Sequence, residues 1–343
     1  MKWIVATPFI KTPDDRWLGA FVPGNRHSFS TVPAHHQHDR HRAQTDAGGW
    51  ADHFLHAWRA LLQAHRSKGG LVTAFPQLPV AAGILSRLII PRVPIVAWTF
   101  NIGKLPSGAK RRMSTFALRR VDAVIVHSRA EVDTCSEWFG IPRAKIVFVP
   151  LQRVVPEALE DEDEGAPYVV ALGSANRDYA LLFDVLRANP VRTIVIASSH
   201  AVAGLDVPPC VELRAGLPLD ECHRILQRAR VSIIPVANAT TASGQVTLLD
   251  SMGMGRATIV TRCPGSTDYV VDGETALLVS PGSREEMTAA LDRLWSDDDY
   301  RNRLGRQGRA HVVRHFSDDA VGRALGQVCD AVEQGRPLPS FDF

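Results

Sequence analysis

Residues 121–150 read VDAVIVHSRAEVDTCSEWFGIPRAKIVFVP, and the order of the apolar runs in this segment indicates the fold class. An apolar run at 122–127 predicts a buried strand, a helical period follows at 130–139, and a second apolar run lies at 145–150. Two short buried strands joined by one helix are typical of a parallel sheet with crossover helices. The stretch therefore predicts an α/β fold.

The same alternation continues on both sides of this stretch. In the first half we expect strands at 2–7, 70–75 and 94–98, and helices near 50–66, 77–90 and 109–120. In the second half we expect strands at 168–173, 192–198, 210–213, 231–236 and 257–261, and helices near 178–188, 219–229, 245–254 and 284–295. Each half is thus predicted to be a Rossmann-like unit.

The length of 343 residues suits two domains rather than one. An acidic run without apolar period at 157–165 predicts an interdomain linker. We expect a final helix in which Ser317 serves as the N-cap and an apolar face packs on another element. The predicted organisation is a first domain at 1–152, a linker at 153–166, a second domain at 167–316 and a C-terminal helix region at 317–343.

Composition favours a cytoplasmic protein. The five cysteines are widely separated and form no metal-ligand spacing, which is typical of a reducing compartment. The apolar run at the start is cut short by Pro8, so we expect no signal peptide, and no apolar run is long enough to span a membrane. The net charge of +3 conceals a basic first half and an acidic second half. Either the first half binds an anionic partner, or the two surfaces of opposite sign help the halves to dock.

Three stretches resemble the retaining family 4 glycosyltransferases, which belong to the glycosyl transferases group 1. Residues 121–150 resemble the stretch that ends the first domain of that family. Residues 243–257, SGQVTLLDSMGMGRA, resemble its most specific signature, and residues 264–279, PGSTDYVVDGETALLV, resemble the segment that follows. The matches occur in the family's order and spacing.

The resemblance implies a GT-B fold, in which two Rossmann-like domains face each other across a cleft and the last helix crosses back to the first domain. It also implies transfer of a sugar, with retention, from a UDP- or GDP-sugar to a glycan or a lipid-linked acceptor. We expect the nucleotide-sugar to be a substrate, and we expect no cofactor, no metal ion and no nucleic-acid partner.

The donor site is expected where loops follow the strands of the second domain. Arg177 takes the place of the family's phosphate-binding lysine, and its guanidinium is suited to two phosphate oxygens. Asp250 is expected to accept hydrogen bonds from the ribose hydroxyls of the donor. A helix start after Gly244 would offer amides and a positive dipole end to a diphosphate. The remaining candidates for donor binding are Gly173, Ser174, Asn176, Gly216, Ser243, Gln245 and Thr247.

The sequence departs from the family pattern at the first of two acidic positions, because residues 240–242 contain no acid. On the acceptor side, Asn101 and His127 follow predicted strands and are the catalytic candidates beside Arg177. A strand-end histidine is as often structural. The missing acid and the aspartate at position 250 leave open a nucleotide-sugar binding protein without turnover. A nucleotide-sugar epimerase is a second alternative, because it shares the architecture.

Two polar groupings bear on other partners. His35, His36, His38 and His41 are better explained by a polar loop than by a metal site. A basic set in the first half predicts an anionic membrane surface, and a lipid-phosphate-linked acceptor at the inner membrane face. This basic set comprises Arg87, Arg92, Lys104, Lys110, Arg111, Arg112, Arg119 and Arg120.

Overall fold

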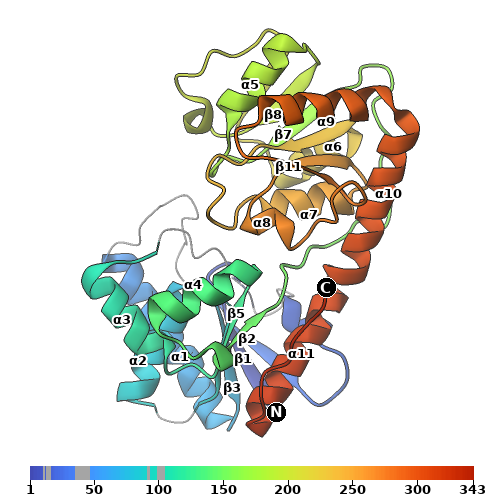
Figure 1. Cartoon of the computed structure of the whole chain (residues 1–343). Coiled ribbons are helices and arrows are strands. Elements are labelled where there is room, and N and C mark those ends of the chain that lie inside the picture. Colours follow the sequence, from blue (N-terminus) through green and yellow to red (C-terminus); the bar gives the residue numbers. More distant parts are fainter. Residues whose placement is uncertain (11, 13–16, 35–46, 91–92, 99–104) are drawn as a thin grey trace. The chain divides into compact units, whose positions relative to one another are not determined.

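The computed structural model describes all of residues 1–343 except 11, 13–16, 35–46, 91–92 and 99–104 (Figure 1). The chain forms two compact units. Unit 1 comprises Met1–Pro150 and Val321–Phe343, and unit 2 comprises Leu151–Ala320. Each unit contains one six-stranded sheet, and the paired strands in both sheets are parallel. The predicted α/β class with two Rossmann-like domains is confirmed.

The sheet of unit 1 has the order β2-β1-β3-β4-β5-β6. Its strands are β1 (Lys2–Ala6), β2 (Ser28–Val32), β3 (Gly70–Ala74), β4 (Ile95–Trp98), β5 (Ala123–Val126) and β6 (Ile146–Phe148). Four of the strands are buried at every position, which explains why their Val- and Ile-rich sequences carry no polar alternation. The sequence pattern did not reveal β2, because this edge strand is mostly half-exposed and reads SFSTV.

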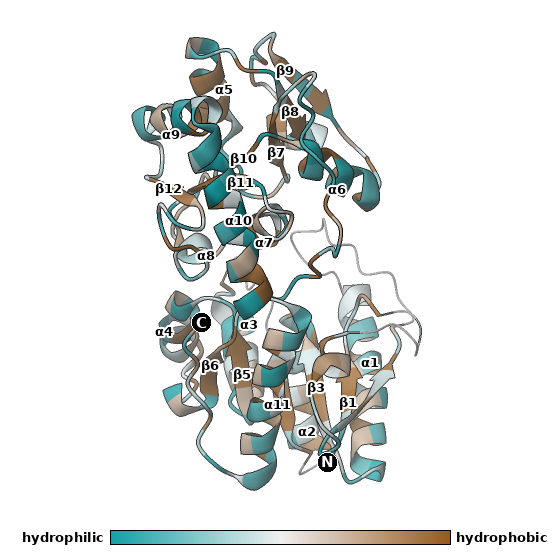
Figure 2. Ribbon diagram, turned by 90° about the vertical axis from the view of Figure 1, so that its right-hand side faces the viewer, coloured by the Kyte–Doolittle hydropathy of each residue, from teal (hydrophilic) through white to brown (hydrophobic). Residues whose placement is uncertain are grey.

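Helices cover both faces of this sheet. The helices α1 (Ala47–Arg66), α2 (Gln77–Leu88), α3 (Gly108–Leu118) and α4 (Arg129–Phe139) share one core with the strands. Short 3-10 turns lie at η1 (Leu18–Phe21) and η2 (Arg143–Lys145). Figure 2 shows brown, apolar strands inside and teal positions on the helices around them.

The other face of the sheet is covered by α11 (Asp318–Gln334). Val321, Leu325 and Val328 of this helix are fully buried and pack in one core with Trp3 and Val5 of β1. As predicted, the Ser317 hydroxyl accepts a hydrogen bond from a backbone amide in the first turn, that of Ala320, at 3.3 Å. Burial of the apolar face explains why the helix that follows unit 2 belongs largely to unit 1.

The sheet of unit 2 has the order β12-β11-β10-β7-β8-β9. Its strands are β7 (Val169–Leu172), β8 (Thr193–Ile196), β9 (Val211–Arg214), β10 (Val231–Ile234), β11 (Ala257–Thr261) and β12 (Leu277–Val279). The chain runs outward from β7 to β9 and then returns to the other side of β7 with β10. The carboxyl ends of β7 and β10 therefore mark the switch point, where open α/β sheets bind ligands.

The helices of unit 2 are α5 (Tyr179–Ala188), α6 (Leu219–Arg228), α7 (Gln245–Gly253), α8 (Pro264–Thr267), α9 (Arg284–Ser296) and α10 (Asp298–His315), with a 3-10 turn at η3 (Ser199–Val202). The helices α5 and α9 share a core with the sheet, whereas α7 contacts α6, α10 and the strands β10 and β11. The sequence pattern did not predict α10, because polar residues dominate it and only a narrow stripe is buried.

The acidic run at 157–165 lies within unit 2. Glu162 accepts a hydrogen bond from Arg230 at 2.8 Å and lies 3.6 Å from Arg301. The backbone amide of Asp163 donates to the carbonyl of Arg228 at 3.0 Å. An acidic run without apolar period is expected to be solvated, but the Glu162 side chain is only 15% exposed. Its carboxylate is needed to compensate two largely buried guanidinium groups.

Candidate functional site

The start of α7 lies at the carboxyl edge of the unit 2 sheet. Gly244 is the N-cap residue with φ +81°, a left-handed conformation that glycine adopts without strain. A Cβ atom at this position would lie 3.1 Å from the Ile234 side chain, so the backbone also approaches β10 closely. No side chain caps the helix. The backbone and the positive dipole end of α7 are therefore offered at the strand ends.

Arg177 reaches this helix start from the loop that follows β7. Its Nη2 donates to the Thr247 hydroxyl in the first turn of α7 at 3.1 Å. Its Nη1 donates to the carbonyl of Ala175 at 2.9 Å, and its Nε donates to the carbonyl of Leu172 at 3.3 Å. Three hydrogen bonds from one guanidinium hold the side chain in a single orientation. Arg177, Gly244 and Thr247, three of the predicted donor-site residues, thus lie together, and their contacts with a donor remain predictions.

The electrostatics of this group favour an anion. A guanidinium beside a helix N-terminus places positive charge next to the positive end of a dipole. Among the residues that the structure describes, no carboxylate lies within 4.0 Å of the Arg177 nitrogens. Burial lowers the pKa of Arg177, although an arginine remains protonated in proteins. A phosphate would supply the negative charge that this arrangement lacks.

The loops that follow β7 and β10 are hydrogen-bonded to each other at the same edge of the sheet. Asn176 has φ +53°, and its side-chain amide donates to the carbonyl of Asn238 at 3.0 Å. In return, the amide of Asn238 donates to the side-chain oxygen of Asn176 at 2.8 Å. Ser174 accepts a hydrogen bond from the amide of Ser198, at the end of β8, at 2.8 Å. Asn176 and Ser174 therefore brace the loop after β7 in this structure, and their predicted donor contacts remain predictions.

Asp250 lies on the second turn of α7 and is 6% exposed. Its carboxylate oxygens accept hydrogen bonds from Arg153, from Nε at 2.6 Å and from Nη2 at 3.0 Å. The Nε2 atom of His223, on α6, lies 3.7 Å from the same carboxylate. Neither Arg153 nor His223 belongs to a recognisable motif, so the sequence did not predict their place beside Asp250. Asp250, which is predicted to bind the ribose, is thus already paired with the Arg153 guanidinium.

The other candidates in unit 2 surround α7 or extend the edge. Gln245 is buried, and its side-chain amide donates to the Tyr269 hydroxyl at 3.3 Å. The hydroxyl of Tyr269 also accepts from the amide of Leu151 at 3.0 Å.

The carbonyl of Ser243 lies 3.6 Å from the Cys263 sulfur. Gly216 occupies an exposed turn after β9 with φ +69°. No described contact links Gly216 to Arg177.

Of the two residues predicted for the acceptor side, Asn101 lies outside the described residues. His127 follows β5, is 2% exposed, and its Nδ1 lies 2.7 Å from the carbonyl of Val149, to which it donates. The Trp98 ring packs against the imidazole with the ring centroids 4.8 Å apart. Burial lowers the pKa of His127 to about 4, so the imidazole is neutral at pH 7. Its catalytic role stays a prediction.

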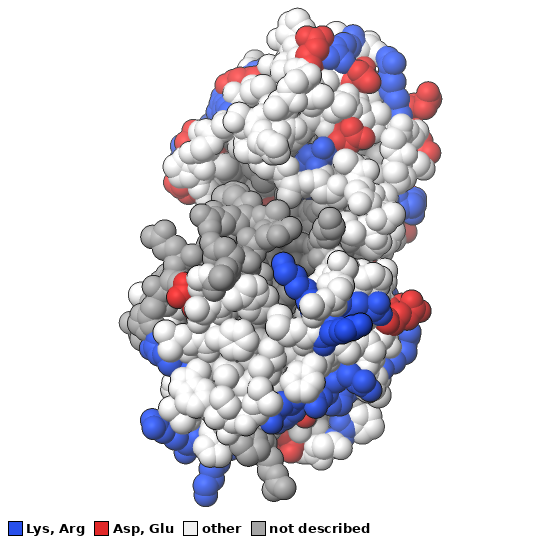
Figure 3. Space-filling view, turned by 90° about the vertical axis from the view of Figure 1, so that its left-hand side faces the viewer, with Lys and Arg blue, Asp and Glu red and all other residues white. Residues whose placement is uncertain are grey.

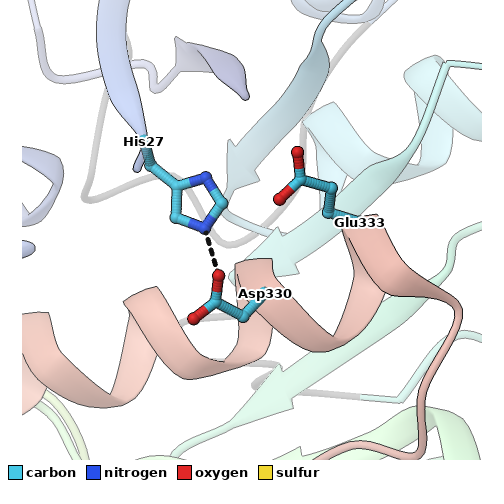
Figure 4. A group of neighbouring side chains, drawn as sticks. All are labelled: His27, Asp330 and Glu333. Carbon is cyan, nitrogen blue, oxygen red and sulfur yellow. Dashed lines mark hydrogen bonds and ion pairs between the residues drawn. The ribbon is translucent and has the colours of Figure 1, made fainter. Parts of the chain in front are cut away.

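A separate cluster in unit 1 joins His27 to Asp330 and Glu333 of α11 (Figure 4). Nε2 of His27 lies 3.0 Å from the Asp330 carboxylate, while the Trp3 indole donates to Nδ1 of His27 at 3.2 Å. Arg26 lies 2.6 Å from Asp330 and 3.4 Å from Glu333. The atoms that could ligate a metal ion are already hydrogen-bonded or ion-paired, and the Arg26 guanidinium already supplies positive charge. The cluster is therefore better suited to attaching α11 to the segment around His27 than to binding a metal.

A basic surface lies on unit 1, where Figure 3 shows Lys and Arg gathered on one face. A groove on this unit combines cationic and apolar side chains. It is lined by Arg87, Gly108, Arg111, Arg112, Thr115, Phe116, Arg119 and Pro142. Four members of the predicted basic set therefore share one groove. Arg120 instead lies 3.6 Å from Asp122, and Arg92 and Lys104 lie outside the described residues.

Exposed apolar side chains accompany this groove. Leu88 at the end of α2 is 69% exposed, Ile89 is 57% exposed, and Phe116 on α3 is 44% exposed. The Arg87 guanidinium lies over the Phe116 ring at 4.6 Å. No helix among the described residues is both long and apolar enough to cross a membrane. Unit 1 therefore presents cationic and apolar side chains together at and beside this groove.

Part of the chain is similar in sequence to known proteins. Residues 185–297 match the family described as Glycosyl transferases group 1. A segment of 122 residues is 32% identical to MMP alpha-(1->4)-mannosyltransferase from Mycolicibacterium hassiacum, covering 35% of this chain and 29% of that protein. A segment of 100 residues is 29% identical to the lipopolysaccharide core biosynthesis glycosyltransferase LpsE from Rhizobium meliloti, covering 29% of each chain. The matched segments thus span less than a third of these relatives.

Solved structures share the fold over nearly the whole chain. Sucrose-phosphate synthase from Thermosynechococcus elongatus aligns with a TM-score of 0.72 at 15% identity, covering 97% of this chain and 99% of that chain. HepE from Anabaena, solved in complex with UDP, aligns with a TM-score of 0.69 at 13% identity, covering 96% and 100%. At such identities the likeness establishes the fold alone.

Proposed function

Because the chain carries a Glycosyl transferases group 1 segment at residues 185–297, we propose that the protein transfers a sugar from a nucleoside-diphosphate sugar to an acceptor hydroxyl. One observation carries the proposal, namely that Arg177 lies at the N-terminus of α7 without a carboxylate partner among the described residues. The HepE structures contain UDP and UDP-glucose, which supports a nucleotide-sugar as the donor class.

The proposed chemistry needs a site that stabilises a departing nucleoside diphosphate. Negative charge develops on the phosphate oxygens as the bond to the sugar breaks. The Arg177 guanidinium, the Thr247 hydroxyl and the helix end at Gly244 would bind that charge. The acceptor hydroxyl bonds to the anomeric carbon on the face that the diphosphate leaves, so the configuration is retained. Its proton passes to the departing phosphate oxygen, and no protein nucleophile is required.

We also propose that the transfer does not depend on a metal ion. Of the carboxylates described at this edge, Asp178 caps α5 by accepting from the amide of Leu181 at 3.0 Å, and Asp250 is paired with Arg153. A divalent ion prefers several oxygen ligands, and its usual partner in such sites is a carboxylate. The cationic groups at Arg177 and α7 would instead balance the diphosphate charge.

For the acceptor we propose a glycan or a lipid-phosphate-linked glycan at an anionic membrane surface, bound through unit 1. The groove on α2 and α3 offers Arg87, Arg111, Arg112 and Arg119 together with an exposed aromatic ring. Each basic residue near such a surface contributes about 1 kcal/mol. The exposed side chains of Leu88 and Ile89 would add an apolar contact.

A nucleotide panel tests the donor proposal. UDP, GDP, ADP and CMP are added to the full-length protein, and the melting temperature is followed by thermal shift. A nucleotide that binds the folded state at 100 times its Kd stabilises the protein by about 2.7 kcal/mol. We expect UDP or GDP to raise the melting temperature and the others to have little effect. A protein stabilised by none of the four contradicts the proposal.

Turnover distinguishes the transferase from the alternatives. The sugar nucleotide whose base binds is incubated with and without a candidate glycan acceptor, and the released diphosphate is measured. Release that depends on the acceptor supports the transferase. Conversion of the donor sugar without acceptor indicates an epimerase. A protein that binds the donor but neither converts nor releases it is a binding protein.

A further inference from the structure

Arg153 lies where the chain has just entered unit 2, two residues after Leu151. Its backbone amide donates to the carbonyl of Phe316 at 2.9 Å, and a β-bridge joins it to Ser317. Its backbone is therefore fixed against the segment by which the chain leaves this unit. From that fixed point, the guanidinium extends to Asp250 on α7 and forms a two-point contact with the carboxylate.

The contact has the geometry of a positioning pair. The bidentate guanidinium prevents rotation of the Asp250 carboxylate, because both oxygens are held at 2.6 and 3.0 Å. An ionised carboxylate offers about four acceptor positions, and this contact uses only two of them. The Nε2 atom of His223, on α6, lies 3.7 Å from the same carboxylate. The remaining acceptor positions keep a fixed direction.

We propose that Arg153 is a positioning residue that aims the Asp250 carboxylate at the ribose hydroxyls of the donor and so sets the preference for a ribonucleotide. The inference rests on the proposed function, because it assigns a task within the same donor site. Arg153 does not itself touch the substrate. It neutralises a carboxylate that is 6% exposed and would otherwise be costly to keep ionised.

The alternative is that the pair only fastens the entering segment to α7. The two readings differ in one measurable quantity, the loss of affinity when the ribose hydroxyls are removed. A fastening role changes stability and changes the affinity for all nucleotides alike. A positioning role changes the discrimination between a nucleoside diphosphate and its 2′,3′-dideoxy form.

The experiment uses isothermal titration calorimetry on the full-length protein, with UDP and 2′,3′-dideoxy-UDP, or with the GDP pair if GDP is the nucleotide that binds. For the wild type we expect removal of both hydroxyls to weaken binding about tenfold. For Arg153→Met we expect that ratio to fall to within about twofold, because the carboxylate is no longer held. Arg153→Lys, which keeps the charge but loses the two-point contact, should give an intermediate ratio.

The control is Arg262→Met, which removes an exposed ion pair with Asp272 in the same unit. It should keep the wild-type ratio. If Arg153→Met fails to fold, the affinity ratio measured for Arg153→Lys distinguishes the two roles, because the lysine still compensates the charge of the Asp250 carboxylate. A folded Arg153 variant with the wild-type ratio overturns this inference alone. A wild-type protein that binds no nucleoside diphosphate overturns the proposed function together with it.

Discussion

A Cβ atom on Gly173 would lie 2.6 Å from Nη2 of Arg177. The space that the guanidinium occupies at the start of α7 exists only because residue 173 has no side chain. Gly173 also has φ +121°, a conformation that other residues rarely adopt. The absence of a side chain at Gly173, just after β7, therefore determines where the Arg177 guanidinium lies.

Arg177→Ala should reduce donor turnover by at least about 100-fold, because the variant loses a cation that stabilises the leaving diphosphate. The fold should remain intact, since the side chain belongs to a strand-end loop. Steady-state kinetics with the identified donor measure the effect. Arg187→Ala, which removes an exposed arginine paired with Asp184 on α5, is the control. Wild-type kinetics in Arg177→Ala would refute the phosphate assignment.

Gly173→Ala should weaken nucleotide binding although residue 173 need not touch the ligand. The added methyl group displaces Arg177, and the backbone strain costs about 1–2 kcal/mol of folding stability. The control Gly204→Ala has the same kind of strain at φ +77° but meets no neighbouring atom within 4 Å. Calorimetry on both variants separates strain from displacement. Equal nucleotide affinity in the two variants would show that the position of Arg177 is unimportant.

Transfer should persist in EDTA, because the cations at Arg177 and α7 replace the charge of a metal ion in the proposed mechanism. Initial rates are measured after dialysis against EDTA, and again with Mg²⁺ or Mn²⁺ restored. We expect rates equal to within about twofold under the three conditions. Activity that disappears with EDTA and returns with either ion would reveal a metal site that the mechanism lacks.

The basic groove should bind vesicles that contain anionic lipid and ignore neutral vesicles in a flotation assay. Binding should weaken as salt rises, since the screening length falls to about 8 Å at physiological ionic strength. Arg112→Glu with Arg119→Glu should abolish binding. The control pair Arg66→Glu with Lys68→Glu makes the same charge change at the exposed end of α1. Equal indifference to both vesicle types at low salt would exclude the membrane surface.

His127 should make the protein less stable in acid. Burial lowers its pKa in the folded state from 6.5 to about 4, so between these values the unfolded chain binds a proton that the folded chain does not. The stability associated with the neutral imidazole is complete above pH 6.5 and declines as the pH falls toward 4. The decline should reach about 2 kcal/mol by pH 5.

Urea unfolding of wild type and His127→Asn at pH 7 and pH 5 measures this effect. The variant should lose less stability between the two pH values than the wild type. His311 in unit 2 has its pKa lowered to about 4 as well, mainly by burial, and this second contribution is present in both the wild type and His127→Asn, so it cancels in the comparison. His65→Asn, an exposed histidine on α1, is the control. Identical pH dependence in wild type and His127→Asn would contradict the burial argument.

The class of fold, and the edge of the sheet that carries the candidate site, could be predicted from the amino-acid pattern. Apolar runs such as those around β5 and β6 alternate with helical periods, and this pattern is local, so a single chain stretch displays it. Parallel strands place their carboxyl ends at one edge, which brings Arg177 and Gly244 together without further information. The apolar face of α11 could also be predicted from the sequence, because it depends only on the helical spacing of apolar residues.

The pairing of charges and the burial of side chains, in contrast, became apparent only in the folded chain. Arg153 and Asp250 are 97 positions apart, and nothing in either local sequence indicates that they meet. The same holds for Glu162 with Arg230, and for the desolvation that keeps His127 neutral. Ion pairs and pKa values depend on distance and burial, which arise when remote segments pack, whereas strand and helix periods are properties of neighbouring residues.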